Sequence, residues 1–372
     1  MSEWKECTLG DVLNFRRGHD LPKSSMANGI IPVAGSNGII GWHDTYTDIS
    51  PVITVGRSGS IGHPYIYEKA WAHNTTLYID DFKGNDPKYL YYLLFTLPLE
   101  QWQAGSAVPT LNRNHIHPLP IIFPNSIEVQ KKIASILSSL DEKIETNRKI
   151  NARLEELAQA LFKSWFIDFE PFGGKMPKDW KEGTIMDMCP KIASGSTPSS
   201  MNKEFYNGKI RWFTTKELKD NFLLDSEKHI SEEAHSSSST KIFPKGTVLM
   251  AIYAAPTVGR LGILTSDSTF NQAAVGLYPK EEIGTIYLYQ YLLNERLKFN
   301  NLAVGAAQQN LSVKFVKEYI CKIPSKEVLD KYNGIINPIF VKIHLLSKES
   351  GRLAEMRDTL LQKLMSGELI PE

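Results

Sequence analysis

The chain has 372 residues, of which 42% are hydrophobic and 22% charged, with a formal net charge of +1. This length exceeds one usual domain of about 150 residues, so we expect about two folded units. No apolar run is long enough to span a bilayer, and no signal-peptide pattern follows Met1, which predicts a soluble cytoplasmic protein rather than a membrane or secreted one.

The cysteines and the charge distribution narrow the possibilities further. Cys7, Cys189 and Cys321 are odd in number and far apart, with no Cys-x-x-Cys pair. This pattern argues against a disulfide scaffold or a zinc site and fits a reducing compartment. Residues 1–125 carry 9 basic and 11 acidic side chains, whereas residues 171–325 carry 19 and 15. Any surface that binds phosphates must therefore be local, or shared with a partner.

Residues 1–125 have the pattern of a mixed sheet domain. Short β-rich runs such as 51–55 are separated by glycines that permit tight turns. These glycines are Gly35, Gly38, Gly41, Gly56, Gly59 and Gly62. The spacing predicts several short strands joined by turns.

A long helix is predicted over residues 126–170. Seam positions repeat in steps of four and three at Ile133, Leu137, Leu140, Ile144, Asn147, Asn151, Leu154, Ala158, Leu161 and Trp165. This is a heptad seam interrupted by two asparagines. One interpretation is that Asn147 and Asn151 sacrifice stability to fix register or orientation; the alternative is that they face solvent where the coil opens.

The linker 171–177 contains prolines and glycines that end the first helix and begin a second mixed domain over residues 171–325. A second long helix follows over residues 326–372. Its seam is Ile336, Ile339, Ile343, Leu346, Ser350, Leu353, Arg357, Leu360 and Leu364. This seam is poorer because Ser350 and Arg357 stand at core positions. Neither helix has an apolar face wide enough to be stable alone, so we expect the two helices to pair.

The two halves of the chain resemble each other in sequence. Six matches occur in the same order, at offsets of 176 to 200 residues. They pair 4–11 with 180–187, 52–55 with 248–251, 60–62 with 257–259, 74–77 with 271–274, 92–94 with 291–293, and 105–112 with 305–312. The chain is therefore predicted to contain a domain–helix unit twice.

Three segments carry a family resemblance. Leu161-Phe162-Lys163-Ser164-Trp165-Phe166-Ile167-Asp168-Phe169-Glu170-Pro171 closely resembles the end of the central conserved helix of type I restriction-modification specificity subunits. Met176-Pro177-Lys178-Asp179-Trp180 is similar to their entry into the second recognition domain, and residues 360–369 resemble their C-terminal signature. Together with Trp4-Lys5-x-x-x-Leu9-Gly10-Asp11, the resemblance covers the whole chain.

The resemblance implies an α+β fold with pseudo-two-fold symmetry. Two mixed α/β target-recognition domains (1–125 and 171–325) are joined by a central conserved helix (126–170) and a C-terminal conserved helix (326–372), which form an antiparallel coiled coil. Each domain would read one half of a bipartite site in double-stranded DNA. The helices would hold the domains apart and dock two adenine methyltransferase subunits, to which ATP-dependent restriction subunits can be added. Residues proposed for partner binding are Arg148, Arg153, Trp165 and Arg352.

We expect no catalysis by this chain. The nearest match to a methyltransferase motif, Asn337-Pro338-Ile339-Phe340, lacks the second proline, and Glu217-Leu218-Lys219 is only part of a nuclease cluster. No Walker loop, His-Glu-x-x-His or Gly-x-Ser-x-Gly occurs. S-adenosylmethionine, ATP and Mg²⁺ are therefore expected on partner subunits, with no cofactor on this chain.

Candidate DNA-binding residues are those that can reach base edges or phosphates. In the first domain they are Arg16, Arg17, His19, Lys23, Asn37, Arg57, Ser58 and Arg113; in the second they are Lys203, Arg211, Lys216, Lys219, Lys241, Arg260, Gln308 and Gln309. Arg57 and Arg260 stand out because both lie beside glycine turns, at places predicted to be equivalent in the repeat. The segments 105–112 and 305–312 are interpreted as scaffold or helix-docking loops.

Two other functions fit the same residues. One is the specificity subunit of a type IIB-like assembly whose partner is a fused methyltransferase-nuclease, and the other is a DNA-binding regulator without an enzyme partner. The identity of the partner separates these possibilities. The sequence reveals neither the recognised bases nor the length of the unread gap.

Overall fold

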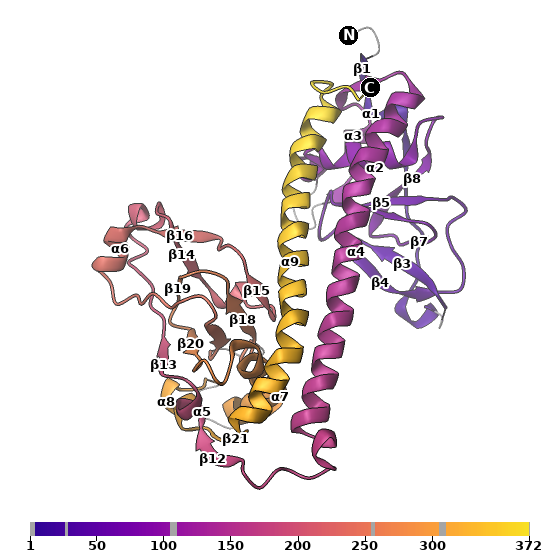
Figure 1. Ribbon diagram of the computed structural model, residues 1–372. Coiled ribbons are helices and arrows are strands. Elements are labelled where there is room, and N and C mark those ends of the chain that lie inside the picture. The colour runs from indigo at the N-terminus through magenta and orange to yellow at the C-terminus, as the bar shows by residue number, and fades with distance from the viewer. Residues whose placement is uncertain (1–3, 27–28, 105–109, 254–256, 305–309, 372) are drawn as a thin grey trace. The chain divides into compact units, whose positions relative to one another are not determined.

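The computed structural model describes residues 4–26, 29–104, 110–253, 257–304 and 310–371 (Figure 1). The chain forms two compact units. The first comprises Met1–Thr146 and Ser350–Glu372, and the second comprises Asn147–Glu349. The two boundaries fall inside the long helices α4 (Ile127–Phe166) and α9 (Lys326–Met365), so each unit contains part of both helices.

The first unit is built on short strands and helices. Its strands are β1 (Trp4–Thr8), β2 (Asn14–Arg17), β3 (Ile31–Gly35), β4 (Gly38–His43), β5 (Val52–Gly56), β6 (Pro64–Tyr67), β7 (Trp71–Ala72), β8 (Thr76–Asp81), β9 (Gln103–Ala104), β10 (Thr110–Leu111) and β11 (Pro120–Pro124). Its shorter helices are α1 (Leu9–Val12), α2 (Pro87–Phe95), α3 (Arg113–Ile116), η1 (Lys23–Ser25) and η2 (Leu99–Trp102). The strands form a four-stranded sheet in the order β2-β8-β5-β6, a three-stranded sheet β4-β3-β7, and the pairs β1-β11 and β9-β10.

The second unit has a closely similar set of elements. Its strands are β12 (Lys181–Thr184), β13 (Lys191–Ser194), β14 (Ile210–Phe213), β15 (Asn221–Leu223), β16 (Lys228–Ile230), β17 (Val248–Ala251), β18 (Leu261–Leu264), β19 (Thr269–Phe270), β20 (Ala274–Tyr278) and β21 (Ile320–Ile323). Its shorter helices are α5 (Ile185–Met188), α6 (Glu232–Ser236), α7 (Thr285–Val304), α8 (Val313–Glu318), η3 (Glu170–Phe172), η4 (Lys203–Tyr206) and η5 (Thr215–Glu217). The sheets have the orders β13-β20-β17-β18-β15, β16-β14-β19 and β12-β21.

The predicted repeat is visible in this topology. Sheet β2-β8-β5-β6 corresponds to β13-β20-β17-β18, and sheet β4-β3-β7 corresponds to β16-β14-β19, with one antiparallel and one parallel pair in each three-stranded sheet. Both units open with a strand and a one-turn helix closed by the same capping box, Thr8 with Asp11 and Thr184 with Asp187. Among the described residues, the second unit has an additional strand, β15, which pairs with β18 in parallel, and the first unit has the additional pair β9-β10.

Equivalent backbone hydrogen bonds within the two units show which residues correspond to each other. They correct two of the sequence matches by one residue. Gly62 N donates to Gly56 O, and Gly259 N donates to Ala251 O, so Gly56 corresponds to Ala251. The sequence match had instead paired residue 55 with Ala251. In the same way, Thr76 N bonds to His73 O and Ala274 N bonds to Asn271 O, which makes residue 73, rather than 74, the counterpart of Asn271.

The long helices contact each other inside each unit. In the second unit, Asn147 is fully buried and its Nδ2 donates to Glu349 Oε2 at 2.8 Å. Asn151 Nδ2 donates to Ser347 Oγ at 3.1 Å. The asparagines therefore lie in the helix interface and do not face solvent, as the first interpretation of the seam requires. Higher numbers on α4 pair with lower numbers on α9, so the helices are antiparallel within this unit.

The seam of α4 and α9 in the first unit includes an ion pair. Arg357, at the position where the heptad pattern expects an apolar residue, donates from Nη1 to Asp141 Oδ1 at 2.7 Å. Ile133 and Leu137 of α4 and Leu364 of α9 join the apolar core of the same unit. Pairing of the helices thus combines apolar packing with charged contacts. No helix in the described part of the chain is both long and apolar enough to cross a membrane.

Candidate nucleic-acid interface

Four segments of the first unit converge at the end of β2. His19 N donates to Ala72 O at 2.7 Å, and Arg57 N donates to Thr75 O at 2.8 Å. Ser36 Oγ donates to the same Thr75 carbonyl at 2.7 Å. The turn before β8 therefore holds together the ends of β2, β3 and β5. We call the polar residues of these segments the first cluster: Arg16, Arg17, His19, Asp20, Asn37, Arg57, Ser58 and Asn74.

Six predicted DNA-binding residues belong to the first cluster. Arg16 and Arg17 are exposed at the end of β2, and Asn37 is exposed in the two-residue turn between β3 and β4. Arg57 and Ser58 are half-buried where β5 ends. His19, the sixth, is also half-buried. Arginine and asparagine side chains at one surface supply groups that bind phosphates and base edges.

Two further candidates lie beside the first cluster. Lys23 is exposed in η1, two residues after Leu21, whose carbonyl contacts His73 Nε2 at 3.3 Å. Arg113 Nη1 donates to Phe15 O at 3.2 Å, so part of its guanidinium holds the backbone of β2. Arg113 is nevertheless exposed in α3.

The second unit has a corresponding cluster with different side chains. Gly18 N donates to Thr76 O at 3.0 Å, and Gly195 N donates to Ala274 O at 3.2 Å. The residues that follow Gly195 therefore stand where His19 and Asp20 stand in the first unit. We call the polar residues at these places the second cluster: Ser196, Thr197, Lys216, Ser239 and Gln272. Apart from Lys216, its side chains are uncharged hydroxyls and an amide.

Lys216 has the same position as Asn37. In the first unit, Ala34 O accepts from His73 N, in the turn before β8, at 3.0 Å, and Asn37 lies three residues after Ala34. In the second unit, Phe213 O accepts from Asn271 N, in the turn before β20, at 2.9 Å, and Lys216 lies three residues after Phe213. Two residues predicted independently thus occupy one position of the repeat.

Other candidates in the second unit are exposed or fall outside the described residues. Lys203 is exposed in η4, and Lys241 is exposed two residues after Ser239, whose hydroxyl contacts Ser196 Oγ at 2.8 Å. Gln308 and Gln309, and most of the loops 105–112 and 305–312, lie outside the described residues.

Arg211 has partners inside the protein. Its Nε donates to Asp225 Oδ1 at 2.8 Å, and its Nη1 donates to Ser266 Oγ at 2.7 Å. Burial tends to raise the pKa of Asp225, but hydrogen bonds from Arg211 and from the Ser226 backbone outweigh this and hold it below its usual value. The guanidinium therefore ties the strand β14 to neighbouring segments, and a phosphate would have to compete with these contacts.

Arg57 and Arg260 are not at equivalent positions, which corrects the prediction from sequence. Leu111 N donates to Arg57 O and Leu311 N donates to Ile252 O, both at 2.8 Å, so Ile252 is the counterpart of Arg57. Arg260 O accepts from Ala251 N, as His63 O accepts from Gly56 N. The error arose because the glycine turns in the two units were compared by sequence spacing without the strand register.

Lys219 and Arg260 lie together on another part of the second unit. Asp220 N donates to Leu261 O at 2.9 Å, which brings the residues next to them, Lys219 and Arg260, to the β15–β18 pair. Asp220 also binds Arg296, whose Nη1 donates to Asp220 Oδ2 at 2.9 Å. These two cations are therefore separate from the second cluster.

The segments that resembled catalytic motifs have structural roles. Asn337-Pro338-Ile339-Phe340 is part of helix α9, and the Phe340 ring packs against Phe222 and Tyr289. Glu217 caps η5 by accepting from Thr214 N at 2.7 Å. Among the residues the structure describes, no three His, Cys, Asp or Glu side chains gather as metal ligands.

All three cysteines are free thiols. Burial raises the pKa of Cys189 and of Cys321 to about 12. Both therefore remain protonated near neutral pH, which makes them poor nucleophiles.

The predicted partner-binding residues differ in their surroundings. Arg148, Arg153 and Arg352 are exposed on the long helices, and Arg153 pairs with Glu156 at 2.7 Å. Trp165 instead packs against Phe172 and Tyr332, within an aromatic group that holds the end of α4 against the rest of the second unit. This packing gives Trp165 a structural role in its own unit.

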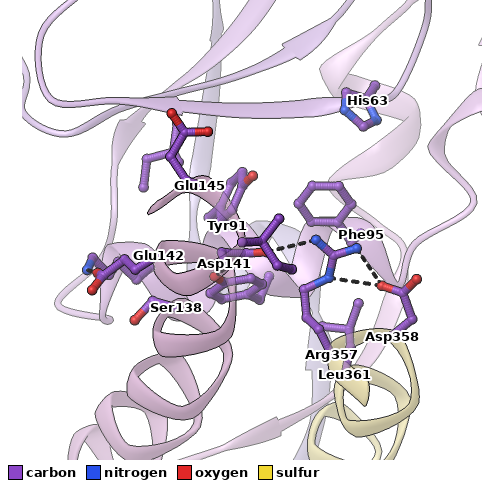
Figure 2. A pocket seen from close by; sticks show the side chains of 14 residues that line it. His63, Tyr91, Phe95, Ser138, Asp141, Glu142, Glu145, Arg357, Asp358 and Leu361 are labelled. Carbon is purple, nitrogen blue, oxygen red and sulfur yellow. Dashed lines mark hydrogen bonds and ion pairs between the residues drawn. The ribbon is translucent and has the colours of Figure 1, made fainter. Parts of the chain in front are cut away.

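A cavity of about 580 Å³ lies between α2, α4 and α9 in the first unit (Figure 2). Asp141, Glu142 and Glu145 of α4 line it, and Arg357 contacts both Asp141 and Asp358. In the second unit, a cavity of about 410 Å³ is lined by the residues 199 positions later, Phe340, Val341 and His344. The two cavities therefore lie at the same position of the repeat. The lining of the cavity in the first unit is charged at this position, and that of the cavity in the second unit is largely apolar.

A family model for the type I restriction modification DNA specificity domain matches residues 1–156 and 177–341. The chain belongs to this family. The type I restriction enzyme MjaIX specificity subunit of Methanocaldococcus jannaschii is 29% identical over 313 residues, covering 76% of this chain and 69% of the relative. The HindI specificity subunit of Haemophilus influenzae is 25% identical, covering 76% and 77%. The crystal structure of the type I S subunit from M. genitalium aligns with a TM-score of 0.68 at 20% identity, over 99% of this chain and 96% of the other.

This specificity subunit is the DNA-recognition subunit of a type I restriction-modification system and assembles with other subunits of that system. The predicted α+β fold, with two mixed domains joined by long helices, is confirmed. The predicted two-fold symmetry concerns the relative placement of the two units and stays a prediction. Asp20, Asn74, Thr197 and Gln272 were not predicted as site residues, although the sequence match of 74–77 with 271–274 contains both Asn74 and Gln272.

Proposed function

We propose that this specificity subunit reads a bipartite site in double-stranded DNA, one half with each unit, and docks two adenine methyltransferase subunits. ATP-dependent restriction subunits join the complex through them. The observation that carries the proposal is the pair of polar clusters, which have one backbone scaffold and different side chains. A reader of two different half-sites needs this combination, because backbone and phosphate contacts fix position while side chains at base edges specify sequence.

The exposed surfaces of the two long helices are consistent with a complex that contains two copies of one partner. Each helix carries apolar side chains that are exposed and lie outside the seam. Ile136 and Leu157 of α4 have counterparts at Ile335 and Met356 of α9, each 199 positions later. Exposed apolar residues at heptad spacing suit the packing of further helices. Because the same pattern occurs on both helices, a single kind of partner surface fits both.

We further propose that the chain itself neither methylates nor cleaves DNA and holds no cofactor. Glu217 caps η5, Asn337 is part of helix α9, and Cys189 and Cys321 are buried in the apolar core of the second unit. S-adenosylmethionine, ATP and Mg²⁺ then belong to the partner subunits. Measurable methyl transfer by the purified subunit alone would contradict this part of the proposal.

The test is co-expression of the full-length chain with the methyltransferase of its system, followed by single-molecule sequencing of methylated DNA. We expect a bipartite motif with an unread gap. Exchange of residues 1–125 for the same part of a relative should change one half of the motif and leave the other. A motif that changes in both halves, or that is continuous, would contradict the assignment of one half-site to each unit.

The same experiment addresses the alternative of a type IIB-like assembly. In that case, the partner that co-purifies carries methyltransferase and nuclease activities on one polypeptide. A separate methyltransferase subunit that co-purifies without nuclease activity favours the type I assembly.

A further inference from the structure

Two hydrogen-bonded side-chain pairs occupy the same place in the two units. In the first, Asn74 Nδ2 donates to Asp20 Oδ1, and in the second, Thr197 Oγ1 donates to Gln272 Oε1. Asp20 lies two residues after Gly18, whose amide donates to the carbonyl of the first residue of β8. Thr197 lies two residues after Gly195, whose amide donates to the carbonyl of the first residue of β20. Asn74 and Gln272 each lie two residues before the first residue of the respective strand. The pairing is therefore retained although all four residues differ in type.

The two glycines explain why these side chains meet. A Cβ atom at Gly18 would lie 2.1 Å from His73 O, and one at Gly195 would lie 2.0 Å from Phe270 O. Only glycine permits this close approach of two backbone segments. The approach brings the residue two positions later next to the turn before β8 or β20. Both units therefore contain a hydrogen-bonded pair of side chains at this place.

The remaining hydrogen-bonding groups of both amides suit a base edge. Asn74 uses one N–H on Asp20 and retains its second N–H and its Oδ1. Gln272 accepts from Thr197 and retains both N–H groups and one lone pair of its Oε1. A side-chain amide with a donor and an acceptor available pairs with adenine N7 and N6 in the major groove. Gln272 is exposed and Asn74 is partly exposed, so both can be approached.

We propose that Asn74 and Gln272 each read an adenine in the half-site bound by their unit, and that Asp20 and Thr197 are positioning residues that orient the amides. The inference rests on the proposed function. Arg17 Nη2 contacts Asp20 Oδ1 at 3.5 Å, and Arg57 N donates to Thr75 O, beside Asn74, so these two cations lie near the pair and supply positive charge for the adjacent phosphates. Lys216 is the one cation of the second cluster. Each amide contributes about 5- to 150-fold discrimination against other bases, the range of a good bidentate contact.

The test uses the full-length chain co-expressed with its methyltransferase, and methylated sites are mapped for wild type, Asn74→Ala and Gln272→Ala. We expect each variant to relax one position of the motif, in opposite halves, with the gap unchanged. Thr197→Val should relax the same position as Gln272→Ala, but less. A purely structural role of Thr197 would lower the yield of complex without changing the motif. Asn125→Ala, an exposed amide at the end of β11, is the matched control and should leave the motif intact.

Gln272→Glu keeps the size of the side chain and its contact with Thr197, so it guards against misfolding of the alanine variant. A carboxylate accepts from cytosine N4, and the preferred base should therefore shift from adenine to cytosine. For Asn74, Asn74→Ser serves as the second, milder variant and should relax the same position as Asn74→Ala. If wild type methylates a bipartite motif and the variants of Asn74 and Gln272 retain every position of it, this inference is wrong and the proposed function stands. If wild type gives no bipartite motif, the proposed function itself fails.

Discussion

Asp141 joins side chains from α2, α4 and α9 in the first unit, and its removal tests what holds these elements together. Arg357 Nη1 donates to Asp141 Oδ1 at 2.7 Å (Figure 2), and Tyr92 Oη donates to Oδ2 at 2.6 Å. The substitution Asp141→Leu removes both acceptors while keeping a side chain of similar size. Arg357 retains Asp358, whereas the Tyr92 hydroxyl loses the carboxylate that accepts its hydrogen bond.

The expected loss follows from the exposure of the two donors. Tyr92 is only 4% exposed, so water replaces little of its hydrogen bond to Asp141, and loss of that bond costs about 1–3 kcal/mol. The side chains of Arg357 and Asp141 are 31% and 32% exposed, so water replaces part of their interaction and the loss is about 0.5–1.5 kcal/mol. We therefore expect Asp141→Leu to lower the local stability by about 1.5–4.5 kcal/mol.

Hydrogen exchange followed by mass spectrometry measures this effect on peptides from residues 127–146 and 350–365. A loss of about 2 kcal/mol corresponds to roughly 30-fold faster exchange, at 1.4 kcal/mol for each factor of ten. Glu142→Leu is the matched control, because its contact with Lys88 is 3.5 Å long and both side chains are exposed. The double variant Asp141→Leu, Arg357→Leu should recover part of the loss by completing the apolar seam. Exchange within threefold of wild type in Asp141→Leu would refute the reasoning.

Two further predictions concern pH and assembly. His117 Nε2 accepts from Phe15 N at 3.1 Å, and its pKa is lowered, first by burial and then by Arg113. Because the folded state favours the neutral ring, the contribution of His117 to folding stability is complete above the ordinary histidine pKa of about 6.5 and is lost as pH falls below it. The urea midpoints of unfolding at pH 7.5 and 5.5 should therefore differ more for wild type than for His117→Gln. Reversing the charges of Arg148 and Arg153 on α4 should weaken methyltransferase binding about tenfold or more, since like charges at an interface are costly; the thermal midpoint should change little, and an intact complex on size-exclusion chromatography would contradict the prediction.

The amino-acid sequence was sufficient to predict the features that depend on local periodicity. The heptad seams on α4 and α9 could be read directly, because a helix that buries one face repeats its apolar residues at a fixed spacing. The duplication was also visible, since turns, capping boxes and buried strands place similar demands on both copies. Thr8 with Asp11 and Thr184 with Asp187 were matched correctly because the capping box spans only four residues.

The register of the strands was decided only by the tertiary structure. A shift of one residue in a strand moves each side chain to the opposite face, and short sequence matches do not resolve such a shift. This is why Asn74 was compared with Asn271 rather than with Gln272. Arg57 and Arg260 are mismatched by more than one residue: both lie beside a glycine turn, but Arg57 follows β5 whereas Arg260 precedes β18. The contacts of Arg211 with Asp225 and Ser266 join residues 14 and 55 positions apart, so no local pattern reports them. Residues on such a surface come from separate strands and turns, and their proximity is a property of the folded chain.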